Sequence, residues 1–328
     1  MATYKGIQGY TVQKLSSDPT ASEVEGQLWY NSTSGAFKLG TTSPASFASG
    51  GNMVNARYRG GAAGTQTATL AIGGYTPPGG VAKTEEYNGS SWAEGNDLNT
   101  GRYILYNGAG TQTAAAYASG YAPTVSPSYN TRNNEYYDGT CWSEKADQST
   151  AHVDAVQFGV QTASFVVAGA LPTTTSAIEE WDGSSWTEAT ALNRTTQELS
   201  GTGTVTAGIA AGGSTDSQPT AVAKTSLWNG SAWTESGDLP YDVRYNGIFG
   251  TSTACITVGG NSPPGQTNNV TSFDGSTWTE IANYPTVINQ TGQGGTTAAG
   301  IVFGGGSGVT TTNEWNDPVY TIKTVTLS

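Results

Sequence analysis

The single histidine, His152, limits the reactive chemistry that this 328-residue chain can support. Zinc and copper centres of the common His-rich kinds need two imidazoles, and a Ser-His-Asp triad would have to use His152 itself. No Gly-x-Ser-x-Gly elbow precedes a helical segment, and metal-binding loops of the Asp-x-Asp type are absent from the sequence. We therefore expect no catalytic residue, no metal site and no cofactor.

Carboxylates are the remaining reactive groups, because glycoside hydrolysis needs only two of them at a defined separation. The chain has 25 Asp and Glu, so composition alone leaves such a pair open. Glu86, Glu180 and Glu314 recur at equivalent positions of a repeat, which would place them far apart around a ring. We expect them to be solvated or to brace neighbouring sheets. An enzyme would instead show a pair ~5–9 Å apart at a channel mouth.

A series of cationic residues also recurs once per repeat, where the chain enters each predicted innermost strand. Two interpretations are open. In the first, each residue braces neighbouring sheets by bonding carbonyls or carboxylates. In the second, the series forms a cationic collar that holds an anionic sugar or carboxylate. This cationic series comprises Arg57, Arg102, His152, Arg194 and Arg244.

Long loops that we expect on the same face as the cationic series form a second candidate surface. They span residues 75–82, 121–133, 214–223 and 261–269 and are rich in Pro, Gly, Asn, Thr and Tyr. This composition suits contact with a glycan or a protein, although ordinary solvated loops share it. Within these loops we expect Tyr75, Tyr121 and Tyr129 to be stacking platforms for a ligand.

A repeat must position all of these residues. An aromatic residue, Asn-Gly or Asp-Gly, two small residues and Trp recur five times. Asn-Gly and Asp-Gly supply positive φ and close a tight hairpin, across which the aromatic residues can pack. A second marker, a Gly/Thr turn followed by an apolar run and Gly, recurs six times. The tryptophans of the first marker are Trp92, Trp142, Trp186, Trp233 and Trp278.

Four strands per repeat at a ~40–50 residue period predict an all-β fold, a six-bladed β-propeller with four-stranded antiparallel blades. We expect both termini to meet at the sixth blade. Either the C-terminal residues 319–327 or the segment around Phe47 would then supply its outer strand. The expected blades span residues 57–98, 101–148, 151–192, 194–240, 243–285 and 287–328. Residues 46–328 would form the propeller, and residues 1–45 a separate short hairpin around Ser34-Gly35.

The charge of the chain limits its partners. Its net charge is −12, and its 13 Lys and Arg form no basic run. Binding to nucleic acid or to an anionic membrane surface is therefore not expected. No apolar stretch approaches the ~20 residues of a membrane-spanning helix, so we expect no membrane insertion. A homo-oligomer stays open, because no coiled coil specifies one.

The repeat markers resemble a degenerate kelch repeat over about residues 46–328. The segment 26–35 (GQLWYNSTSG) is similar to the N-terminal attachment hairpin of bacteriophage virion proteins. The motifs Gly-Thr-Gln-Thr-Ala and Tyr-Asn-Gly-Ser-Ser-Trp are similar to kelch-like repeats of phage tail fibres. This resemblance implies a virion protein of the tail or particle surface whose partners are other virion proteins and a host-surface glycan or protein. Trp29, Tyr30 and Phe37 would then attach it.

Two other functional classes stay open. One is a secreted carbohydrate-binding or carbohydrate-active propeller, which the carboxylate pair described above would favour. The other is an intracellular interaction scaffold. The familiar adaptor arrangement places a partner domain beside the propeller, and none is visible in this sequence. The expected function is therefore non-enzymatic attachment and binding on a virion.

Overall fold

The computed structural model describes residues 12–124, 129–170, 173–215, 220–306 and 308–326. Within them the secondary structure is strand, apart from one 3-10 turn, η1 (Ala21–Glu23), and α-helix is absent. The predicted all-β class is therefore confirmed. The chain divides into two compact units. Unit 1 consists of Met1–Ser46 and Asp317–Ser328, and unit 2 of Phe47–Asn316.

Unit 1 is built on a four-stranded sheet with the order β1-β2-β3-β33. The hairpin between β2 and β3 turns at Ser34-Gly35, as predicted, and Gly35 has a φ of 67°. The Asn31 side chain fixes the turn by accepting the backbone N–H groups of Thr33 and Ser34, each at 3.0 Å. The strands are β1 (Gln13–Leu15), β2 (Leu28–Asn31), β3 (Ala36–Ser43) and β33 (Val319–Thr324).

The C-terminal strand corrects one prediction. β33 pairs antiparallel with β3, from Lys38 opposite Thr324 to Ser43 opposite Val319. The expected sixth-blade range 287–328 is therefore wrong beyond Asn316, and β4 (Ser46–Ser49) is the outer strand there instead. The physical reason is that Phe47 already fills the aromatic position. Its ring lies 4.9 Å from the Tyr284 ring and 5.1 Å from the Trp315 ring, measured between centroids.

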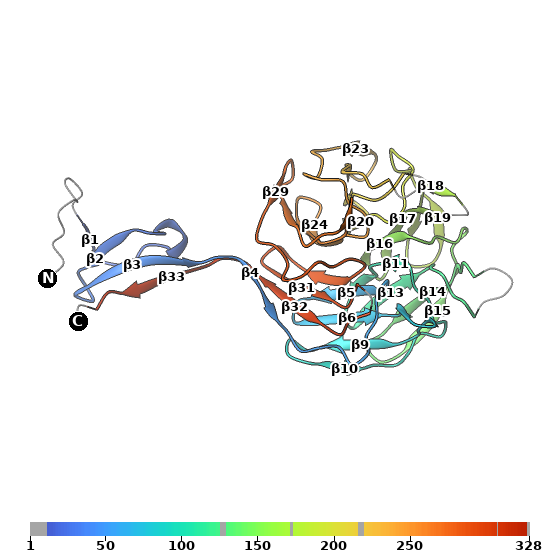
Figure 1. Ribbon diagram of the computed structural model, residues 1–328, viewed down its shortest axis with the longest axis horizontal. Coiled ribbons are helices and arrows are strands. Elements are labelled where there is room, and N and C mark those ends of the chain that lie inside the picture. The colour runs from blue at the N-terminus through green and yellow to red at the C-terminus, as the bar shows by residue number, and fades with distance from the viewer. Residues whose placement is uncertain (1–11, 125–128, 171–172, 216–219, 307, 327–328) are drawn as a thin grey trace. The chain divides into compact units, whose positions relative to one another are not determined.

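Unit 2 consists of four-stranded antiparallel sheets that follow one another along the chain, here called sheets 1 to 6. Figure 1 shows them arranged about a common centre, the arrangement of a propeller-like fold. Sheet 1 contains β5 (Gly61–Thr65), β6 (Ala68–Ile72), β9 (Thr84–Tyr87) and β10 (Trp92–Glu94), and sheet 2 contains β12 (Ala109–Thr111), β13 (Ala114–Ala118), β14 (Asn134–Tyr137) and β15 (Trp142–Lys145). Sheet 3 contains β16 (Ala155–Val160), β17 (Ala163–Ala170), β18 (Thr174–Trp181) and β19 (Trp186–Glu188), with β11 (Leu105–Tyr106) added in parallel to β16.

The remaining sheets follow the same order. Sheet 4 contains β20 (Ser200–Thr204), β21 (Ala207–Ala211), β22 (Thr225–Trp228) and β23 (Trp233–Glu235). Sheet 5 contains β24 (Gly247–Thr251), β25 (Ala254–Val258), β28 (Val270–Phe273) and β29 (Trp278–Glu280). Sheet 6 contains β30 (Gly292–Gly295), β31 (Ala299–Phe303), β32 (Thr312–Asn316) and β4. Two short hairpins extend the loops, β7 (Tyr75–Thr76) with β8 (Gly79–Gly80) and β26 (Asn261–Ser262) with β27 (Gly265–Gln266).

The innermost strands of consecutive sheets contact each other, and β30 of sheet 6 also contacts β5 of sheet 1. Before each innermost strand, one non-glycine residue with a φ of 52–60° donates its N–H to the carbonyl of its counterpart in the preceding sheet. These six bonds measure 2.8–3.0 Å. A left-handed conformation costs a non-glycine residue ~1–3 kcal/mol, so the surrounding structure must hold it. The six residues, here called the axial ring, are Arg59, Ile104, Asp154, Glu198, Tyr245 and Gln290.

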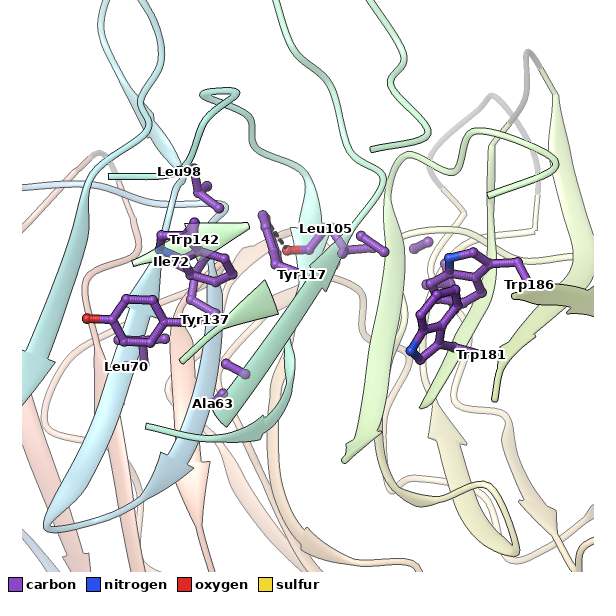
Figure 2. Close-up of a cluster of buried hydrophobic side chains, with 14 residues drawn as sticks. Ala63, Leu70, Ile72, Leu98, Leu105, Tyr117, Tyr137, Trp142, Trp181 and Trp186 are labelled. Carbon is purple, nitrogen blue, oxygen red and sulfur yellow. Dashed lines mark hydrogen bonds between the residues drawn. The ribbon is translucent and has the colours of Figure 1, made fainter. Parts of the chain in front are cut away.

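Aromatic pairs fill the space between the sheets, as the hairpin motif predicts. The ring centroids of Tyr137 and Trp142 lie 5.1 Å apart, and those of Trp181 and Trp186 lie 5.3 Å apart. Figure 2 shows both pairs within one buried apolar cluster that also contains Ile72 of sheet 1. Trp142 Nε1 donates to Thr84 Oγ1 of the preceding sheet at 3.0 Å. The motif therefore packs each sheet against its neighbour.

Glutamines and glutamates add polar links between sheets. Gln112 Nε2 donates to two carbonyls of sheet 1, those of Thr69 at 3.1 Å and Tyr87 at 2.7 Å. Gln66 makes the same pair of bonds to sheet 6, and Gln161 to sheet 2. The hydroxyl of Tyr87 donates to Glu314 at 2.6 Å, so that carboxylate braces neighbouring sheets. Glu86 accepts the Tyr137 hydroxyl in the same way, at 2.5 Å.

Candidate functional site

The first three members of the cationic series are buried against carboxylates of the third strands. Arg57 Nη2 lies 2.9 Å from Glu85 Oε1, and Arg102 forms the equivalent ion pair with Glu135. His152 Nε2 lies 3.5 Å from Glu179 Oε1. All six side chains are at most 4% exposed. The carboxylate partners agree with the bracing interpretation, but each contact joins the residue to the third strand of the sheet that it precedes, and not to a neighbouring sheet.

Arg194 and Arg244 depart from this pattern, because sheets 4 and 5 have no Glu at that position of the third strand. Arg194 is half-buried and donates to the Ser226 hydroxyl and, at 3.1 Å, to the Lys224 carbonyl. Burial lowers the pKa of Arg194 to about 10, which leaves it cationic at neutral pH. Arg244 Nη1 donates to Glu198 Oε2 at 2.6 Å. Each member of the series therefore has an acceptor within the protein, and ligand binding by the series stays a prediction.

Arg244 also borders a surface cavity. A cavity of about 290 Å³ is lined by Arg244, Ala221 and residues 261–266, which include the hairpin of β26 and β27. The Arg244 side chain is 20% exposed. Its Glu198 partner neutralises much of the attraction that the guanidinium would have for an anion.

The axial ring brings two carboxylates to neighbouring positions that the sequence motifs do not mark. The N–H of Glu198 donates to the carbonyl of Asp154, and the hydroxyl of Tyr106 donates to Asp154 Oδ1 at 3.2 Å. Burial, with the nearby charge of Glu198, raises the pKa of Asp154 to about 6. Glu198 itself is occupied, because it accepts both the Tyr245 hydroxyl and Arg244. Glu86, Glu180 and Glu314 lie elsewhere, on the third strands.

Tyrosines form a continuous row over the loops of sheets 1 and 2. Consecutive ring centroids lie 5.3, 5.0, 5.3 and 5.6 Å apart. Four of the rings are half-buried, and the last, Tyr129, is 51% exposed. Burial, with the neighbouring Tyr121 and Tyr75, raises the pKa of Tyr103, so its hydroxyl stays protonated at neutral pH. The members of this tyrosine row, in order, are Tyr58, Tyr75, Tyr103, Tyr121 and Tyr129.

The row contains the three predicted stacking residues, Tyr75, Tyr121 and Tyr129, and two that the sequence reasoning missed. Tyr58 exchanges backbone hydrogen bonds with Tyr75 at 2.7 and 3.2 Å. Tyr103 makes the same exchange with Tyr121 at 2.8 and 3.0 Å. The signal that could have found them is the dipeptide Arg-Tyr, since both follow a member of the cationic series directly.

The centre of unit 2 holds a polar cavity of about 190 Å³ between the innermost strands. Glycines are the most frequent of its lining residues, and Asn107, Thr202 and Gln293 supply the polar side chains. Gln293 Nε2 donates to Asn107 Oδ1 at 2.6 Å, and Asn107 Nδ2 donates to the Gly201 carbonyl at 3.2 Å. These bonds link segments of three sheets, and no carboxylate or cation is among the described lining residues. The described lining therefore supplies amide, hydroxyl and backbone groups for hydrogen bonding.

One face of the unit 1 sheet carries exposed apolar side chains among the described residues. Successive residues of a strand point to opposite faces, so Leu28 and Tyr30 share a face with their neighbour Phe37. The rings of Tyr30 and Phe37 lie 5.2 Å apart, and Phe37 is 40% exposed. Val319 and Val325 of the adjoining C-terminal segment are exposed as well. We call this surface the apolar face.

Trp29, the third predicted attachment residue, lies on the opposite face and is only 2% exposed. Its Nε1 donates to Asp18 Oδ1 at 3.0 Å. Hydrogen bonds from Asn31 and then Trp29 lower the pKa of Asp18. The structure therefore brings together Tyr30 and Phe37 on one face, while Trp29 is buried on the opposite face of the sheet.

No protein-family model matches this chain, and no curated protein is significantly similar to it. Across the part of the chain that the structure describes, no group of three or more His, Cys, Asp or Glu could hold a metal ion. A search of the same residues finds no helix long and apolar enough to cross a membrane. The chemistry of the described surfaces is thus the basis for a functional proposal.

Proposed function

We propose that this chain is a non-enzymatic virion protein of a bacteriophage, a tail-fibre, tail-tip or decoration module. Unit 1 attaches it to other virion proteins, and unit 2 binds a glycan or protein of the host surface. In this proposal unit 2 is a closed propeller of six kelch-like blades. The hydrogen bonds of the axial ring support closure, because they run from Arg59 through five counterparts and back to Arg59.

The observation that carries the binding role is the tyrosine row. It is a partly exposed aromatic strip on the face that also carries the long loops, where binding residues concentrate in scaffolds of this kind. Aromatic rings with a polar hydroxyl offer apolar contact area at a low cost in side-chain entropy. The row is therefore suited to recognition.

Attachment is supported by the apolar face of unit 1. Leu28, Phe37 and Val325 are exposed, and Val325 lies beside Phe37, to whose carbonyl it donates its N–H at 2.9 Å. Exposed apolar side chains that gather on one face mark interaction surfaces. Tyr30 adds an amphipathic ring. We assign this face, with Tyr30 and Phe37, to contact with another virion protein.

The test is to locate the protein on particles. Antibodies raised against the purified chain should label the tail or the surface of the phage that encodes it in electron micrographs. The purified protein should also compete with that phage for adsorption to its host. Unlabelled particles together with unimpaired adsorption would rule out the proposed function.

One observation favours a second candidate, a carbohydrate-active propeller. Asp154 has a pKa raised to about 6 and neighbours Glu198, the kind of arrangement that a general acid uses. Glu198 is already paired with Arg244, which argues against a free second carboxylate. Sugar release from a polysaccharide panel that disappears in Asp154→Asn would favour this enzyme over the non-enzymatic proposal.

A further inference from the structure

We infer that the tyrosine row is the binding site of an uncharged glycan chain, which lies lengthwise along the five rings. This inference deepens the proposed function and rests on it, because it names the ligand class of the host-facing surface. Four steps support it: the spacing of the rings, their rigidity, the charges beside the rings and the small area of the strip.

The spacing provides repeated contacts. Each ring follows the previous one at 5.0–5.6 Å between centroids, and three of the four steps are T-shaped or nearly so, with interplanar angles of 60–64°. A regular series of amphipathic rings suits a polymer of small rings that have apolar C–H faces and hydroxyl edges. Such a polymer contacts several tyrosines at once, which raises affinity with chain length.

The row is held rigidly before any ligand arrives. The backbone exchanges between Tyr58 and Tyr75 and between Tyr103 and Tyr121 fix four of the five residues. The backbone of β8 packs directly on Tyr103, since a Cβ built at Gly80 would lie 2.8 Å from Tyr103 Cδ1. A pre-ordered surface loses less entropy on binding.

The charges around the row disfavour an anionic sugar. Among the described residues Arg59 contacts the row, and its guanidinium carbon lies 5.8 Å from the ring centroids of both Tyr58 and Tyr245. It also interacts with Asp154 of the axial ring. Arg57 and Arg102 are buried and paired with carboxylates. A chain with a net charge of −12 adds repulsion at longer range.

The size of the strip disfavours a protein partner. A stable protein interface buries ~800 Å² on each side. The row is a single line of rings of which four are half-buried, too narrow to form such a patch. A single chain of sugars can bind along one line of contacts and needs no such patch.

The experiment uses the full-length protein on a glycan array. The array carries neutral cello- and chito-oligosaccharides of increasing length, acidic oligogalacturonates and basic glucosamine oligomers. We expect neutral chains to bind, with affinity that rises with length. Tyr103→Ala and Tyr121→Ala should each weaken binding about tenfold or more, as expected when one aromatic anchor of an interface is removed.

Matched variants separate binding from folding. Tyr103→Phe keeps the ring and should retain most of the affinity. Tyr320→Ala removes an exposed tyrosine from β33 in unit 1 and should leave affinity unchanged. Arg132→Ala removes an exposed cation from the loop of Tyr129, and it should not matter if the ligand is uncharged. Melting temperatures of all variants identify any that fail to fold.

Several outcomes would overturn the inference. They are equal affinity of Tyr103→Ala, Tyr121→Ala and the parent protein, preference for acidic oligomers, and no binding to any neutral chain. Cell binding that protease treatment of the cells abolishes would indicate a protein receptor, which ends this inference but leaves the proposed function intact. Neutral-glycan binding by a protein that is absent from virions would end the proposed function instead.

Discussion

Replacement of Arg102 by alanine is the sharpest test of the bracing interpretation. The guanidinium is fully buried and forms an ion pair with Glu135. It also donates to the carbonyls of Thr100, at 2.9 Å, and Tyr117, and its Cζ lies 4.9 Å from the Tyr117 ring centroid. Alanine removes all of these contacts and leaves the Glu135 carboxylate buried without its cation.

The expected cost follows from that geometry. Breaking a buried ion pair by removing one partner costs ~3–5 kcal/mol, because an uncompensated charge remains. Glu135 keeps hydrogen bonds from the backbone N–H groups of Asn99 and Thr100 and the Asn99 side chain, which places the cost toward the lower end. Arg102→Leu combined with Glu135→Leu removes both charges and should cost less than the single alanine variant.

Urea unfolding followed by tryptophan fluorescence measures this free energy. The midpoint should fall for Arg102→Ala with an unchanged slope, and much less for Arg244→Ala, whose side chain is 20% exposed. Arg132→Ala, an exposed position, provides the baseline. If Arg102→Ala were as stable as Arg132→Ala, the bracing interpretation would fail. If Arg102→Ala also lost binding of an anionic ligand, the cationic-collar interpretation would replace the bracing interpretation.

Three further predictions concern other contacts. Thr84→Val should cost ~1 kcal/mol through loss of the bond to Trp142, and Trp142→Phe should cost more because part of a buried ring is lost as well. A double variant that costs the full sum of the two in urea unfolding would show that the bond contributes nothing. Gln112→Ala should cost ~1–3 kcal/mol because two buried carbonyls lose a donor, and an unchanged urea midpoint would contradict that role. Folding raises the pKa of Asp154 to about 6, so the stability that its protonation provides is full below about pH 4 and is lost as the pH rises through 6. The stability of Asp154→Asn minus that of the parent protein should therefore be larger at pH 7 than at pH 4. Parallel pH profiles of the two proteins would refute this.

Local chemistry made much of this fold predictable. Asp182 accepts the backbone N–H groups of Ser184 and Ser185 at 2.8 Å, which closes the Asp-Gly hairpin within four residues. Hydrogen bonds from Ser185 and Ser184 lower the pKa of Asp182 to about 2. Signals of this kind need no knowledge of distant parts of the chain, so the repeat markers, the hairpins and the aromatic pairs could be located from the sequence.

The parts that the sequence reasoning missed depend on long-range pairing. Tyr58 and Tyr103 carry no turn or strand signal of their own, and they enter the row because bridges to Tyr75 and Tyr121 place them there. The axial carboxylates come together because sheets separated by more than forty residues meet at the centre. Residues 319–324 alternate as a strand would in either location, so only the competing fit of Phe47 decides their partner.

The pairing of β33 with β3 makes unit 2 a guest inserted into unit 1. The chain enters the guest at Phe47 and leaves it at Asn316, and these points are neighbours because Gly50 donates to the Thr312 carbonyl at 3.0 Å. Expression of unit 2 alone would therefore require removal of both the N-terminal and the C-terminal segment of unit 1, because removal of the N-terminal segment alone would leave β33 without its partner strand β3. It also follows that a pull exerted on unit 1 reaches unit 2 through two covalent connections, at residues 46–47 and 316–317.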